Sequence, residues 1–220
     1  MAKPLWIAAL AALLPLVAAC GGNVDVLAPD GSGTAGAGGS GTGGNGSGGG
    51  NGGAGGSLPP QCQVATAQVP PYATTFRFVN PTGQVLCLHQ GCNLDFSVTA
   101  CADGYVAPLV LWADCSVDCS DPPGGGCIAC GACWEGGVPV DPGGVLEASW
   151  TGLTYTFGQN ADGCPCHTGH KVAPSKYRLL APVYETEEAA ELGQPIWQAG
   201  VDFQLPAPGG RVDVPLAGML

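Results

Sequence analysis

The chain is poor in positive charge. It has six Lys and Arg against seventeen Asp and Glu in 220 residues, a formal net charge of −11. Nucleic-acid binding depends on Lys and Arg at phosphates, so we expect no nucleic-acid partner. The sequence also lacks the Gly-x-Ser-x-Gly elbow, the His-Glu-x-x-His motif, a phosphate loop and a dinucleotide fingerprint. We therefore expect a protein that is not an enzyme.

The chain has no apolar run of the roughly 20 residues that a membrane-spanning helix needs. Its longest run, 5–17, follows a single basic residue and precedes small residues, which is the pattern of a secretory signal. The run ends in Val17-Ala18-Ala19-Cys20, which resembles the lipobox of bacterial lipoproteins. This resemblance implies removal of the signal peptide 1–19, attachment of lipid at Cys20 and acylation of the new amine. The alternative is an ordinary secretory signal that is cut without lipid.

The resemblance also implies where the protein is located. A lipidated Cys20 holds a protein at a membrane without a spanning helix, since each buried CH2 contributes about 0.8 kcal/mol. Gly21 follows the cysteine, as in the outer-membrane sorting pattern of some bacteria. We therefore expect a protein of the cell envelope, anchored by lipid in the outer membrane.

A glycine-rich segment follows the expected anchor. Residues 31–57 contain 16 Gly among 27, with no charge and no large apolar residue. Such a composition cannot bury enough apolar surface to offset the entropy of ordering, so it predicts a disordered linker. A flexible chain of this length has a root-mean-square reach of about 26–31 Å. The sequence thus predicts a signal peptide at 1–19, a lipidated N-terminus and linker at 20–57, and one folded domain at 58–220.

The folded domain has the pattern of an all-β protein. Short runs rich in Val, Leu, Phe, Tyr and Thr are separated by Gly, Pro, Asn or Asp, which is typical of strands and turns. The expected strands are 74–79, 85–88, 94–99, 106–112, 145–150, 153–157, 177–184, 201–205 and 212–216. Residues 185–192 predict a solvated turn or a short helix, with a plain loop as the alternative. Strands without alternating helices predict an antiparallel β-sandwich.

Three motifs carry a resemblance to a known fold. Pro142-Gly143-Gly144, Trp150-Thr151-Gly152 and Ala173-Pro174 ahead of Tyr177 resemble the immunoglobulin-type sandwich of the bacterial intracellular proteinase inhibitor family. The resemblance covers 142–205 and implies an immunoglobulin-like sandwich. Proteinase inhibition follows from it only as an analogy of fold, and no reactive site is carried over.

The cysteines indicate a disulfide framework. Export favours oxidation, and eleven cysteines remain when Cys20 is assigned to lipid. Because eleven is odd, at least one cysteine is free, binds metal or pairs between molecules. Segment 115–133 holds five cysteines among Pro and Gly, which predicts a disulfide-rich loop insertion. The disulfide candidates are Cys62, Cys87, Cys92, Cys101, Cys115, Cys119, Cys127, Cys130, Cys133, Cys164 and Cys166.

One short segment has the donors of a metal site. Cys164, Cys166, His167 and His170 lie within seven residues, and thiolate with imidazole suits Zn or Cu. The alternative is two disulfides in a loop that carries two exposed histidines. Cys164 and Cys166 flank Pro165, so we expect each to pair with a different segment rather than with the other.

Two further groups in the cysteine-rich loop have the donor atoms of possible sites. Cys127, Cys130 and Cys133 form overlapping Cys-x-x-Cys units, but no βαβ pattern surrounds them, so structural bridges are favoured over redox chemistry. The carboxylates of the same loop lack EF-hand spacing and are expected to be solvated; they are Asp114, Asp118 and Asp121.

The sequence thus predicts a lipid-anchored envelope protein with a non-catalytic binding or structural domain. The expected contact with a protein or envelope partner is the loop 115–134, because disulfides fix a protruding surface before it binds. Metal binding at 164–170 and proteinase inhibition are the alternatives.

Overall fold

The computed structural model describes residues 58–218, which belong to one compact unit, Gly52–Leu220. The lipobox, Cys20 and the linker 31–57 lie outside the described residues. Within 58–218, no helix is long and apolar enough to cross a membrane.

The first sheet of the sandwich has three strands. Its central strand β1 (Thr74–Val79) pairs antiparallel with β6 (Val145–Trp150) and parallel with β11 (Arg211–Pro215). The strict alternation of β1 places Phe76 and Phe78 on its buried face. In the described part of the chain β6 pairs only with β1, so its outer edge is free.

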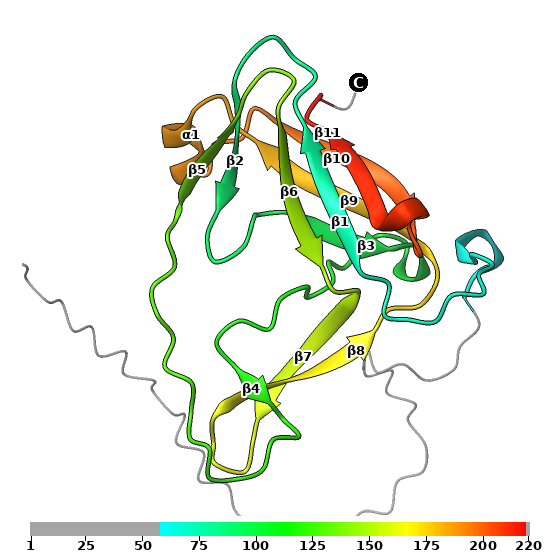
Figure 1. Cartoon of the computed structure of the whole chain (residues 1–220), viewed down its shortest axis with the longest axis vertical. Helices are drawn as coiled ribbons and strands as arrows, with labels where there is room; N and C mark the ends of the chain where they lie inside the picture. The colour runs from blue at the N-terminus through cyan, green and yellow to red at the C-terminus, as the bar shows by residue number, and fades with distance from the viewer. Residues whose placement is uncertain (1–57, 219–220) are drawn as a thin grey trace, which may run out of the picture. The chain divides into compact units, whose positions relative to one another are not determined.

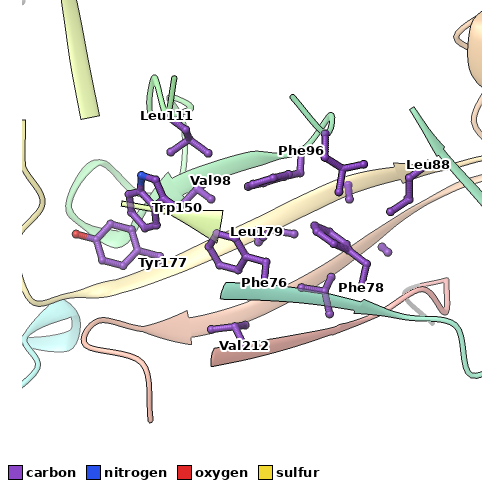
Figure 2. Packing of buried hydrophobic residues seen from close by; sticks show 14 of the residues in the cluster. Phe76, Phe78, Leu88, Phe96, Val98, Leu111, Trp150, Tyr177, Leu179 and Val212 are labelled. Atoms are coloured by element: carbon purple, nitrogen blue, oxygen red, sulfur yellow. The ribbon is translucent and has the colours of Figure 1, made fainter. Parts of the chain in front are cut away.

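The second sheet is antiparallel. Its central strand β9 (Lys176–Val183) lies between β3 (Ser97–Ala100) and β10 (Trp197–Gln204). Both sheets contribute to one core, and Figure 2 shows Phe76 and Phe78 of the first sheet packed close to Leu179 of the second.

A two-stranded sheet continues beside the end of β9. It consists of β2 (Leu86–Gln90) and β5 (Gly136–Val140), and an isolated bridge joins Cys87 of β2 to Tyr184. The one α-helix described, α1 (Glu187–Glu191), packs against β2 and β5. Thr186 caps this helix, because its Oγ1 accepts a hydrogen bond of 3.1 Å from the backbone N–H of Ala189.

Three strands form a separate sheet away from the others (Figure 1). β7 (Leu153–Gln159) and β8 (Pro165–Lys171) make an antiparallel hairpin, and β4 (Val117–Asp118) pairs parallel with β8. None of these three strands contributes to the main apolar core. We call residues 114–135 and 153–171 the cystine lobe, since disulfides hold them together.

The predicted all-β sandwich with a disulfide-rich loop insertion is confirmed. The short helix expected within 185–192 is also present as α1. Three short 3-10 helices complete the described elements: η1 (Pro60–Cys62), η2 (Cys101–Asp103) and η3 (Pro208–Gly210).

Some predicted strands differ from those observed. Residues 106–112 form no strand, only a bridge between Pro108 and Thr99, since proline has no N–H to continue a ladder. Conversely, β4, β5 and β8 were not predicted. The antiparallel prediction holds for most pairs, but β1–β11 and β4–β8 are parallel.

Candidate functional site

Ten of the eleven cysteines in the described region form disulfides. Cys62–Cys101 joins η1 to η2, and the other four bonds hold the cystine lobe. These four are Cys92–Cys133, Cys115–Cys130, Cys119–Cys166 and Cys127–Cys164. Cys164 and Cys166 therefore pair with different segments, as expected.

The loop 120–135 is exposed along its whole length. All sixteen of its residues are on the surface, so it has no apolar core of its own. Disulfides fasten it instead at Cys127, Cys130 and Cys133, each to a different segment. The backbone N–H of Gly124 also donates a 2.7 Å hydrogen bond to Asp162 Oδ2. The loop is thus an exposed surface that covalent bonds hold in place.

The β7–β8 turn provides the fixed base of this loop. Asn160 Oδ1 accepts hydrogen bonds from the backbone N–H groups of Asp162 (3.0 Å) and Cys164 (2.9 Å). Cys164 and Cys166 are buried, whereas Cys127, the loop cysteine bonded to Cys164, is exposed. The sulfur of Cys164 that anchors the loop, and that of Cys166 that anchors Cys119 just before it, thus lie on a well-bonded hairpin.

The structure does not bring the four predicted metal ligands into one donor set. The sulfurs of Cys164 and Cys166 are in disulfides and so are not thiolates. His167 Nδ1 lies 2.9 Å from Ser116 Oγ, and His170 Nε2 lies 3.0 Å from Thr156 Oγ1. Side chains alternate along a strand, so the two histidines of β8 point to opposite faces. Within residues 58–218, no three His, Cys, Asp or Glu side chains are grouped to hold a metal.

The loop carboxylates make separate local bonds. Asp118 accepts hydrogen bonds from the Ser120 side chain (2.7 Å) and backbone (2.8 Å), which lower the pKa of its carboxyl. Asp114 accepts a hydrogen bond from Asn93 Nδ2. The Cys-x-x-Cys units likewise form no internal disulfide, because Cys127, Cys130 and Cys133 each bond elsewhere.

Cys87 is the odd cysteine, unpaired among the described residues. It is 2% exposed and packs with Tyr184 and with Ala190, a residue of α1. Burial raises the pKa of its thiol, and the nearby carboxylate of Glu187 raises it further. A buried thiol of raised pKa is a poor nucleophile.

We therefore expect one free thiol that reacts only after unfolding. Treatment of the exported protein with iodoacetamide at pH 8 should leave Cys87 unmodified under native conditions. In denaturant without reductant, one alkyl group should be added at Cys87, and intact mass should show ten missing hydrogens. Several alkylated thiols in the native protein would contradict the disulfide assignment.

Large apolar side chains are exposed on the cystine lobe. Trp134 is 62% exposed and Phe157 is 54% exposed, and Ile128 is also on the surface. Trp134 lies against the backbone of Gly136, where a Cβ would come within 2.8 Å of the indole ring. Phe157 lies opposite His167 in the β7–β8 hairpin. The sequence marked the loop 115–134, but not Phe157, because only the hairpin register places it on the lobe.

Comparison of the chain with protein-family models, curated proteins and solved structures finds no match.

Proposed function

We propose that the protein is a lipid-anchored protein of the cell envelope whose non-catalytic β-sandwich presents the cystine lobe to a protein partner. The observation that carries this proposal is the exposed loop 120–135, fixed by three disulfides. An exposed loop without a core normally loses conformational entropy when it binds. Covalent fixation reduces that cost before the partner arrives.

The apolar side chains of the lobe suit this role. Protein interfaces are enriched in aromatic residues, and a few of these usually dominate the binding energy. Trp134, Ile128 and Phe157 place such groups on the lobe. A lobe kept only for solubility has no need of three large exposed apolar side chains, two on the loop and one on β7.

The N-terminal sequence suits it as well. The resemblance to a lipobox at Cys20 supports attachment to a membrane, and the predicted linker follows the attachment site in sequence. A tethered binding domain encounters partners in the same envelope at a high effective concentration.

Site-specific photo-crosslinking in intact cells tests the proposal. Benzoylphenylalanine at Trp134 or Ile128 should give a discrete crosslinked product. The matched control is the same amino acid at Leu192, which is also 62% exposed but follows α1. Products should be at least about fivefold more abundant from the lobe positions than from Leu192.

The Cys20→Ala variant separates the anchor from the contact. It should move to the soluble fraction and lose most of the Trp134 product, because the effective concentration falls. Equal crosslinking from Trp134 and Leu192 would refute the lobe as the contact surface. Membrane retention of Cys20→Ala would refute lipid anchoring.

A further inference from the structure

Trp112 lies between two hollows beside the cystine lobe. Their volumes are about 210 and 390 Å³, and both have Trp112 and the turn residues 92–94 in their walls. The indole ring is half-buried and meets Phe96 edge to face at 5.9 Å between centroids. The ring is therefore anchored in the core and still borders open space on the surface.

The rim of these hollows is fixed. The turn after β2 closes through a 3.0 Å hydrogen bond from Gly91 N–H to Asn93 O. Asn93 Nδ2 donates to Asp114, and Cys92 is bonded to Cys133 at the end of the exposed loop. A site held in this way loses little freedom when a ligand enters. The disulfide also makes the proposed contact loop part of the same rim.

The smaller hollow runs along the free edge of β6. Leu146, Glu147, Ala148 and Ser149 line it. Asn80 N–H donates a 3.0 Å hydrogen bond to Gly144 O, which fixes which residues of β6 bond to β1. Because these residues alternate along an antiparallel strand, the backbone groups of Glu147 and Ser149 point away from β1. Unpaired groups on an edge strand are a template for an extended peptide.

The charge of the site selects a cation. Asp95, Asp114 and Glu147 line the two hollows, and neither has Lys or Arg in its wall. Arg77 of β1 forms an ion pair of 3.2 Å with Glu147 and so neutralises that carboxylate. Asp95 and Asp114 remain as the carboxylates that can attract a cation. An indole face attracts ammonium and guanidinium groups, and adjacent carboxylates add to this attraction.

A third hollow, larger than these two, does not select a ligand in this way. It measures about 630 Å³ between β10 and β11, and it is lined by Lys176 and Arg211 as well as Asp202 and Asp213. Charges of both signs there favour no single class of partner.

We infer that the site at Trp112 binds an extended basic segment of the protein partner. The segment pairs along the free edge of β6 and places one Arg or Lys side chain beside the Trp112 ring and the carboxylates of Asp95 and Asp114. This inference rests on the proposed function, because Cys92–Cys133 joins the contact loop to the rim.

A peptide pair tests the inference on the full chain in neutral detergent. The probe is acetyl-Val-Thr-Arg-Thr-Val-amide, and its matched control has citrulline, a neutral analogue, in place of Arg. The expected result is a shift of the Trp112 indole signal in NMR spectra of the tryptophan-labelled protein. Both citrulline in the peptide and Trp112→Leu in the protein should weaken binding about tenfold. Leu192→Ala, an exposed change beside α1 that keeps every charge and lies outside both hollows, should change it less than about twofold.

Charge variants keep the test valid if Trp112→Leu unfolds the protein. Asp95→Asn should weaken the Arg peptide about two- to fivefold, whereas Glu188→Gln on α1 removes the same charge and should have no effect. A peptide with alternate backbone nitrogens methylated should also bind more weakly, since it cannot pair with β6. Equal binding of the Arg and citrulline peptides would overturn the inference.

The two proposals fail separately. Crosslinks at Trp134 without a shift of the Trp112 signal would support the lobe as the contact surface and refute binding of a basic segment at Trp112. A shift of the Trp112 signal without crosslinks at Trp134 would support a cation site at Trp112 and refute the lobe as the contact surface.

Discussion

Replacement of Phe76 by alanine is expected to lower the free energy of unfolding by about 3–5 kcal/mol. Phe76 is fully buried at the centre of the sandwich. Its ring centroid lies 5.3 Å from that of Phe96, directly before β3, and 5.4 Å from that of Phe203 in β10. Figure 2 shows Phe76 and Phe96 in the same core. Alanine would leave a cavity between the two sheets. Urea unfolding of the oxidised full chain, followed by circular dichroism, measures the change.

Phe157→Ala is the matched control. It removes the same side chain from the cystine lobe, where the ring is 54% exposed. We expect a change within about 0.5 kcal/mol, because little apolar surface returns to water. A loss similar to that of Phe76→Ala would mean that Phe157 is buried and is not an exposed binding residue.

Strand periodicity predicted the central sheet well. The expected runs 74–79 and 145–150 coincide with β1 and β6, because each alternates side chains between core and solvent. The end of a strand is harder to predict, and β10 begins four residues before the expected 201.

Strands held by tertiary contacts could not be recognised in this way. β5 begins with Gly136-Gly137 and contains Pro139, a composition typical of a turn. The structure explains one of these glycines, since a Cβ on Gly137 would lie 2.5 Å from the Cα of Glu187. β8 has no apolar alternation, and its pairing with β7 and its disulfide Cys119–Cys166 hold it in place.

The candidate sites depended even more on the fold. The sequence predicted the position of the disulfide-rich loop but not which of its cysteines pair with which others. It placed Trp112 at the end of an expected strand. Only the fold brings Trp112 to the turn after β2 and to the edge of β6. The segment 164–170 has the composition of a metal site, but its two cysteines are in disulfides. Its two histidines point to opposite faces of β8, because side chains alternate along a strand.

Gly152→Ala is expected to lower the free energy of unfolding by about 2–4 kcal/mol. Gly152 forms the turn between β6 and β7, where the cystine lobe leaves the sandwich. Its φ is +75°, and a Cβ would lie 2.7 Å from the backbone of Tyr72. The turn is also held by hydrogen bonds from Trp150 Nε1 to Leu153 O and from Val172 N–H to Gly152 O. The substitution therefore adds a collision with the backbone to an unfavourable dihedral angle, and urea unfolding measures the sum.

Gly143→Ala separates the two contributions. Its φ of +72° is almost the same, but no atom lies within 4 Å of the added Cβ. It should therefore lose only about 1–2 kcal/mol, the cost of a left-handed conformation for alanine. Both variants reduce the entropy of the unfolded chain equally, so this effect cancels in the difference. Equal losses would mean that the β6–β7 turn moves away from Tyr72 at no cost, and that the base of the cystine lobe is not fixed against the sandwich.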